Sequence, residues 1–361
     1  SNAPWINIFI HGTLRAEGSA ANPIVFTSIK DDDPAHGGDT NGDGASSTPS
    51  AGDWGDINFS ATGSGSLEHV WVGYGGENLD IAGTSEVTVR ASTIAHALNN
   101  GIYVGDGSPT IEDTEFRENA DCGIKFRGFD AVQPIALTGN TFISNTNCAV
   151  HAALTYETVD ITLEGNTGSG SLYNGFGIGG TISGTVAYST DAVFPFVAAS
   201  NVEVVAGADW NLAPGTVIKA NASSINYWIH GFLIAEGTET DPIIFTSIKD
   251  DDPAHGGDTN GDVAGSTPAA GDWGDINFST TGRGSLDHVW VGYGGDNLDI
   301  AGSTDITVRN STIAYAGGSG INVVDASPTI EQNTLEHNGA SALTVGGPTS
   351  APFVSANRLL Y

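Results

Sequence analysis

The residues with the clearest chemical potential form one short, strongly acidic stretch. Asp39-Thr40-Asn41-Gly42-Asp43-Gly44 fits the pattern D-x-N-x-D-G, and three consecutive aspartates precede it. In such a pattern alternate oxygen side chains converge on one cation, while the glycines let the backbone bend. Carboxylates this close repel one another unless a cation intervenes. The stretch therefore predicts a cation site whose ligands are Asp31, Asp32, Asp33, Asp39, Asn41 and Asp43.

The donor atoms of this stretch favour Ca²⁺ over Zn²⁺. They are hard oxygens, and His36 is the nearby nitrogen donor. The stretch is not an EF-hand, because the twelfth position counted from Asp39 is Ser50, where a bidentate Glu would be required. Acidic, glycine-rich loops are often only solvated surface, which is the alternative. An insertion of some 20 residues needs something to order it, and we expect a structural calcium ion to do so.

The acidic stretch occurs twice, because the chain is a tandem duplication. The segment from Ser28 to Asp43 returns unchanged 219 positions later (247 − 28), from Ser247 to Asp262. We predict two modules, at residues 4–185 with an acidic loop at 28–53 and at residues 186–361 with an acidic loop at 247–272. Residues 1–3 are expected to be a tag remnant. Val263 replaces the glycine of the first copy, so we expect a distorted or weaker second site, with ligands Asp250, Asp251, Asp252, Asp258, Asn260 and Asp262.

A finer period inside each module predicts the elements that hold these loops. Apolar anchors recur at nearly equal intervals along the chain, at Val72, Ile94, Phe116 and Phe142. Short alternating stretches surround the anchors, as half-buried strands do, and Gly and Asn mark the corners. Asparagines such as Asn140 and Asn166, or Asn333 and Asn357, are placed to form ladders between coils. The pattern predicts an all-β protein, a parallel β-solenoid in which the two modules form one continuous solenoid.

Three segments of the second module resemble a known group of proteins. They are Ala213-Pro214-Gly215-Thr216-Val217-Ile218-Lys219, His230-Gly231 with the residues through Gly237, and Asp241-Pro242-Ile243-Ile244-Phe245-Thr246-Ser247. The series continues into Gly271-Asp272-Trp273-Gly274 and resembles the right-handed parallel β-helix repeat proteins of bacterial surfaces, which share the pectin-lyase fold. The resemblance implies a right-handed β-helix and a secreted or cell-surface location in bacteria. It does not choose an activity, because this fold hosts lyases, hydrolases, epimerases, adhesins and inert scaffolds.

Charge and cysteine content limit the classes of binding partner and the state of the two cysteines that we expect. Asp and Glu number 42 against 11 Lys and Arg, a formal charge of −31 that disfavours nucleic acid and attracts divalent cations. No apolar run is long enough to span a membrane in this fragment. Cys122 and Cys148 are separated by the same interval as Asn119 and Asn145. The cysteines are expected on neighbouring coils within disulfide range, either bonded or as a reduced pair.

Enzymes of this fold need paired carboxylates or a strong base in a cleft. Lys125 and Arg127, near Arg117, are weak catalytic candidates, although outward basic residues on a strand are also ordinary solubility devices. Trp71 could stack on a sugar ring or pack beneath the acidic loop. We therefore expect a non-catalytic, calcium-stabilised extracellular or cell-surface scaffold for adhesion or glycan binding, with a polysaccharide or another surface protein as partner. The alternative is a polysaccharide lyase, epimerase or hydrolase.

Overall fold

The computed structural model describes residues 6–83, 86–105, 107–127, 134–153, 157–190, 193–302 and 305–360. The expected tag remnant at residues 1–3 lies outside these ranges. The described residues form β-strands and two short 3₁₀ helices, η1 (Pro34–His36) and η2 (Pro253–His255). The chain forms two compact units, unit 1 with Ser1–Ala152 and Glu164–Gly175, and unit 2 with Ala153–Leu163 and Phe176–Tyr361. No helix in these ranges is long and apolar enough to cross a membrane.

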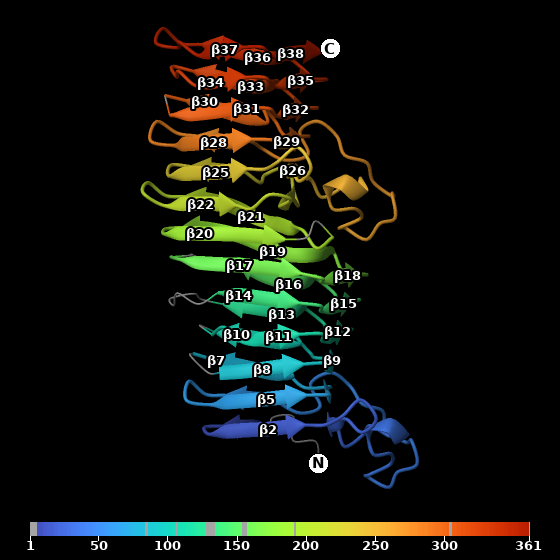
Figure 1. The fold of residues 1–361 in the computed structure, drawn as a ribbon. Helices are drawn as coiled ribbons and strands as arrows, with labels where there is room; N and C mark the ends of the chain where they lie inside the picture. Colours follow the sequence, from blue (N-terminus) through green and yellow to red (C-terminus); the bar gives the residue numbers. More distant parts are fainter. Residues whose placement is uncertain are drawn as a thin grey trace. The chain divides into compact units, whose positions relative to one another are not determined.

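Unit 1 winds through three parallel ladders, one strand per ladder in each coil (Figure 1). The first ladder contains β1 (Ile8–Ile10), β4 (Ile57–Phe59), β7 (Leu79–Ala82), β10 (Ile102–Gly105), β13 (Cys122–Arg127) and β16 (Cys148–Ala153). The second contains β2 (Thr13–Glu17), β5 (Ser64–Glu68), β8 (Glu86–Arg90), β11 (Thr110–Glu112) and β14 (Ile135–Thr138). The third contains β3 (Ile24–Phe26), β6 (Val70–Gly73), β9 (Thr93–Ala95), β12 (Glu115–Arg117), β15 (Thr141–Ile143) and β18 (Thr167–Ser169).

Unit 2 repeats this plan, and its long strand β21 (Phe196–Val204) pairs with strands of two ladders at once. The first ladder contains β19 (Tyr173–Ile182), β21, β24 (Tyr227–Ile229), β27 (Ile276–Phe278), β30 (Leu298–Ala301), β33 (Ser319–Val324) and β36 (Ser341–Gly346). The second contains β17 (Val159–Glu164), β20 (Thr185–Thr190), β22 (Asp209–Leu212), β25 (Phe232–Glu236), β28 (Arg283–Asp287), β31 (Ile306–Arg309), β34 (Thr329–Glu331) and β37 (Phe353–Ser355). The third contains β21, β23 (Val217–Ala220), β26 (Ile243–Ser247), β29 (Val289–Gly292), β32 (Thr312–Ala314), β35 (Thr334–Glu336) and β38 (Arg358–Leu360).

The periodic apolar anchors build the core. Val72, Ile94, Phe116 and Phe142 are register partners on consecutive strands, and all four are fully buried. The rings of Phe116 and Phe142 stack with their centroids 5.0 Å apart. Stacking like residues on successive coils buries apolar surface continuously, which favours the solenoid. The predicted all-β right-handed parallel β-helix is confirmed.

Asparagine side chains join the coils at their corners. In unit 1 the Nδ2 of Asn140 donates to the Oδ1 of Asn166 at 3.1 Å, and both residues are fully buried. In unit 2 the Nδ2 of Asn333 donates to the Oδ1 of Asn357 at 3.0 Å. These bonds satisfy polar groups that would otherwise be costly inside the coil. The expected asparagine ladders are present in both units.

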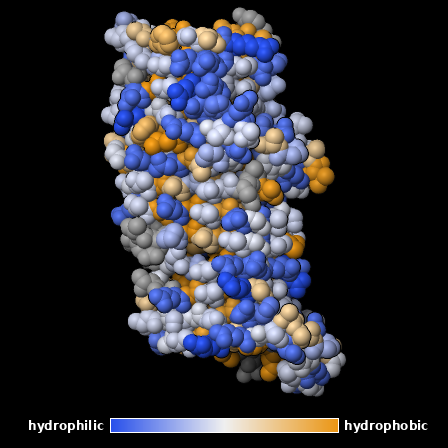
Figure 2. Space-filling model, in the orientation of Figure 1, coloured by the Kyte–Doolittle hydropathy of each residue, from blue (hydrophilic) through white to orange (hydrophobic). Residues whose placement is uncertain are grey.

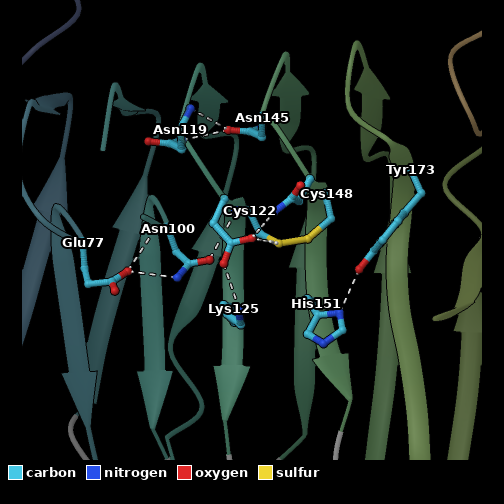
Figure 3. The surroundings of a disulfide bond; sticks show 11 residues. Glu77, Asn100, Asn119, Cys122, Lys125, Asn145, Cys148, His151 and Tyr173 are labelled. Atoms are coloured by element: carbon cyan, nitrogen blue, oxygen red, sulfur yellow. Dashed lines mark hydrogen bonds and ion pairs between the residues drawn. A yellow bond between two sulfur atoms is a disulfide. The ribbon is translucent and has the colours of Figure 1, made fainter. Parts of the chain in front are cut away.

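A disulfide bond joins Cys122 and Cys148 on neighbouring coils of unit 1 (Figure 3). The two residues are register partners on β13 and β16, and their Cα atoms lie 4.6 Å apart. The Nδ2 of Asn119 donates to the Oδ1 of Asn145 at 2.8 Å nearby. The sequence left open whether the two cysteines are bonded or reduced, and in the structure they are bonded.

Candidate metal centre

The two acidic loops, residues 28–53 and 247–272, are called lobe 1 and lobe 2. Each projects from the strands of its own unit, lobe 1 in blue and lobe 2 in yellow to orange in Figure 1. A carboxylate closes the base of each lobe. In lobe 1 the carboxylate of Asp53 accepts bonds from the Nζ of Lys30 at 2.5 Å and the Oγ of Ser28 at 2.7 Å. In lobe 2 the carboxylate of Asp272 accepts the equivalent bonds from Lys249 at 2.7 Å and Ser247 at 2.8 Å.

Each lobe is also held against its unit by a tryptophan. The imidazole of His36 packs on the indole of Trp71, with ring centroids 4.0 Å apart, and lobe 2 repeats this contact with 4.3 Å between His255 and Trp290. The Trp71 indole also lies close to Gly73, where a Cβ atom would come within 2.2 Å of the ring. Trp71 is buried, with 7% exposure, which leaves no open ring for a sugar. Of the two roles that the sequence allowed for Trp71, the structure supports packing beneath the lobe.

Three aspartates of each lobe come together. Carboxylate oxygens of Asp32, Asp39 and Asp43 lie within 4.8 Å of one another. Both oxygens of Asp32 are buried and accept no hydrogen bond of normal geometry from the described residues; the backbone amide of Ala45 approaches the carboxylate and only partly offsets its charge. Burial and the charges of Asp39 and Asp43 raise the pKa of Asp32. The equivalent cluster of lobe 2 contains Asp251, Asp258 and Asp262, and the pKa of Asp251 is raised by the same causes. Each cluster therefore concentrates negative charge that hydrogen bonds within the lobe compensate only in part.

Backbone hydrogen bonds hold the carboxylates in this arrangement. The Oδ1 of Asp39 accepts from the backbone N of Asp43 at 3.0 Å, and its Oδ2 accepts from the N of Gly44 at 3.0 Å. Lobe 2 keeps both bonds, from Asp262 at 3.1 Å and from Val263 at 2.9 Å, to Asp258. Val263 therefore does not disturb the hydrogen bonds of the second lobe. It adopts the left-handed conformation that Gly44 adopts, with φ of 52° against 62°, so the substitution adds backbone strain instead.

The other predicted ligands of each lobe are not members of the three-aspartate clusters. Asp31 is only 4% exposed; although burial opposes it, hydrogen bonds from Thr27, the Asp33 amide and His36 lower the pKa of Asp31. Asp33 begins η1, where its Oδ1 accepts from the N of Ala35 at 2.8 Å. Asp250 and Asp252 occupy the same positions in lobe 2. Asn41 and Asn260 lie beside the clusters, with Nδ2 atoms donating to Asp43 at 3.1 Å and Asp262 at 2.9 Å.

The donor set of each cluster fits a hard divalent cation. Ca²⁺ takes six to eight oxygen ligands in a flexible geometry, so three converging carboxylates would supply part of the shell and carbonyl groups or water the rest. In lobe 1, Asp32, Asp39 and Asp43 are the residues that would hold the ion. Its chemistry there would be charge compensation, since the cluster offers no nitrogen or sulfur donor of the kind that zinc prefers.

The weak catalytic candidates divide between two ladders. Lys125 and Arg127 lie on β13 of the first ladder, and Arg117 lies on β12 of the third. Lys125 forms an ion pair with Asp121, 2.8 Å between Nζ and Oδ2, and Arg127 donates from Nη1 to the Oη of Tyr103 at 3.2 Å. Arg117 contacts Glu115, with 3.3 Å between Nε and Oε1.

Sequence reasoning missed a histidine beside Lys125. His151 is the register partner of Lys125 on β16, and its Nδ1 lies 2.8 Å from the Oη of Tyr173 (Figure 3). Burial and the charge of Lys125 lower the pKa of His151, against the effect of Asp121. The interval that separates the two cysteines also separates Lys125 from His151, and that was the available signal.

A comparison of the sequence with known protein families supports the β-helix fold. Residues 75–203 match a family model described as a right handed beta helix region. Searches of the curated proteins and of the solved structures gave no match. The matched segment and the three parallel ladders define the class of this protein as a right-handed parallel β-helix.

Proposed function

We propose that this chain is a non-catalytic scaffold whose two lobes each bind Ca²⁺. The proposal includes a bacterial, pectin-lyase-like origin and a role in adhesion or glycan contact outside the cell or at its surface. The observation that carries the calcium part is the convergence of three carboxylates in each lobe, where both oxygens of Asp32 and the Oδ1 of Asp251 are buried without a hydrogen-bond partner of normal geometry. An ion that binds only the closed lobe would stabilise it, by about 2.7 kcal/mol at a free concentration one hundred times Kd.

Substitutions of Asp32 and Asp251 test this proposal. Asp32→Asn and Asp251→Asn keep the shape of each side chain and remove one charge from each cluster. In EDTA, the double variant should resist proteolysis within the lobes better than the wild type, because repulsion is relieved. In millimolar Ca²⁺ the order should reverse, because the variant has lost a charged ligand. Asp209→Asn, outside the lobes, should respond to Ca²⁺ as the wild type does. Lobes whose cleavage and melting ignore Ca²⁺ in the wild type would refute calcium binding.

Two features support a location outside the cytosol. The bond between Cys122 and Cys148 is of the kind that persists in oxidising compartments. The formal charge of −31 suits contact with divalent cations, and Figure 2 shows hydrophilic side chains over much of the visible face. A thiol titration of the protein purified from its native source, without reductant, tests the first point. Two free thiols would count against an oxidising compartment.

One cluster supports the alternative of a polysaccharide lyase, epimerase or hydrolase. Asp121, Lys125, His151 and Tyr173 join through contacts or register on unit 1, and a base beside a cation could remove a proton from a sugar acid. Unit 2 has Thr344 at the position of Lys125. Ultraviolet absorbance of unsaturated products from acidic polysaccharides tests lyase activity, and assays of reducing ends and of epimer content test the other two. A scaffold gives no signal in any of them at any enzyme concentration.

A further inference from the structure

An outward-facing row of side chains crosses the first ladder of unit 2. Its members are register partners on consecutive parallel strands, so they point to the same side of the sheet. The residues Trp228, Asn277, Asp299, Asn322 and Thr344, on β24, β27, β30, β33 and β36, form what we call the unit 2 row. The residues that flank Trp228 on β24, Tyr227 and Ile229, are buried in the core. The row therefore lies on the outer side of the sheet, although Asn277 itself is buried, with 9% exposure.

An exposed indole begins the row. The Trp228 residue is 40% exposed, whereas Trp210 and Trp273 are buried in the core of the same unit. Unit 1 has an aromatic ring at the equivalent position, Phe9, which is 61% exposed. Single exposed apolar residues are common on protein surfaces. Here, however, both units expose a large ring at the same point of the coil, and in both an asparagine and then an aspartate follow it on the next two strands.

The polar members of the row are held in place by hydrogen bonds. The Nδ2 of Asn322 donates to the Oδ1 of Asp299 at 3.2 Å. The Nδ2 of Asn277 donates to the Oδ1 of Asn226 at 3.3 Å and to the carbonyl of Asp275 at 3.2 Å. In unit 1 the Nδ2 of Asn58 donates to the Oδ2 of Asp80 at 2.7 Å. Fixed amide and carboxylate groups can bind a ligand with little loss of side-chain entropy.

Spacing and charge together indicate the ligand class. At about 4.8 Å per strand, Trp228 and Asp299 lie roughly 10 Å apart on a flat surface. Trp228, Asn277, Asn322 and Thr344 are uncharged, and the one charged member is Asp299. Asp275 and Asp296 add negative charge close to Asp299, and Glu203, the register partner of Trp228 on β21, adds negative charge beside the indole. Such a surface repels anionic polymers. The carboxylate accepts hydrogen bonds from hydroxyl groups, the amides donate and accept, and the indole offers an apolar face.

We propose that the unit 2 row binds an uncharged polysaccharide, with one sugar ring on the indole of Trp228 and hydroxyl groups of a neighbouring sugar on Asp299. The proposal rests on the glycan contact proposed above and names its surface and its ligand class. It does not depend on calcium, because the row contains no residue of either lobe.

Affinity electrophoresis of the intact chain tests the row. Gels containing hydroxyethyl cellulose, galactomannan or dextran are compared with a gel containing polygalacturonate. At least one uncharged polymer should retard the wild type, and polygalacturonate should not. Trp228→Ala should weaken the retardation at least fivefold, while Trp228→Phe, which restores the aromatic ring found in unit 1, should keep most of it. Phe353→Ala, which removes an exposed ring from the second ladder, is the matched control and should bind as the wild type does.

The outcomes separate this proposal from the calcium proposal. Retardation should be the same in Ca²⁺ and in EDTA, so lobes without calcium would leave this result standing. Asp299→Asn should weaken binding without lowering the melting temperature. The proposal is overturned if none of the three uncharged polymers retards the wild type, if polygalacturonate retards it instead, or if Trp228→Ala binds within twofold of the wild type.

Discussion

Val263 provides the sharpest test of how backbone conformation sets the stability of a lobe. Its side chain is 85% exposed and its φ is 52°, so a β-branched residue adopts a left-handed conformation without packing in return. That conformation costs an L-residue about 1–2 kcal/mol, and glycine offsets roughly 0.5–1 kcal/mol of this through its greater entropy when unfolded. We therefore expect Val263→Gly to stabilise the closed form of lobe 2 by about 1 kcal/mol.

Amide hydrogen exchange measures this effect where it arises. The N–H groups of Asp262 and Val263 donate to Asp258, and their exchange should slow about fivefold in Val263→Gly, since about 1 kcal/mol is roughly that factor. Gly44→Val makes the opposite change at φ 62° in lobe 1 and should speed exchange there by a similar factor. Exchange that changes less than twofold in both variants would show that left-handed strain at this position does not control the lobe.

Three further substitutions have clear expected outcomes. The buried Nζ of Lys219 donates to the carbonyls of Asp250 and Gly257 at 2.6 Å each. Lys219→Met should therefore loosen lobe 2 by about 2 kcal/mol, seen as faster cleavage within residues 247–272 than in the wild type while cleavage within 28–53 is unchanged; the same cleavage of 247–272 as in the wild type would contradict it. Replacing Cys122 and Cys148 together by Ser should cost about 3 kcal/mol of unfolding free energy, read from denaturant melts, and a loss below about 1 kcal/mol would contradict this. Burial and Asp56 raise the pKa of Asp80, so the ionised carboxylate destabilises the fold; Asp80→Asn should raise Tm at pH 7, and the gain should vanish as the pH falls below the ordinary value near 4. A gain that persists at pH 3 would refute that reasoning.

The core was predictable because it is periodic. Val72, Ile94 and Phe116 recur at a nearly constant interval, and only a coil of fixed length places such residues on top of one another. The asparagine ladders followed from the same interval. The exact repeat of the acidic stretch also identified both lobes, since identical stretches in equivalent coils fold alike.

The selection among neighbouring aspartates could not be predicted. Asp31 and Asp32 are chemically identical and adjacent, but the backbone turns Asp31 toward Thr27 and His36 and Asp32 toward the cluster. Local backbone geometry decides this, and sequence spacing does not report it. The unit 2 row could not be predicted from the sequence for another reason. Trp228 and Asn277 are neighbours across a pair of strands, but all of lobe 2 lies between them in the sequence.

The disulfide bond determines what a protease cut does to this chain. Cys122 and Cys148 join adjacent coils, so one cut anywhere between them leaves two fragments that stay covalently attached. Strands β13 and β16 would also remain hydrogen-bonded to each other as a parallel pair. Molecules nicked in that interval would run as one band on a non-reducing gel and as two after reduction. In surroundings rich in proteases, the disulfide bond would thus keep the two fragments of a cleaved chain together and the coil intact.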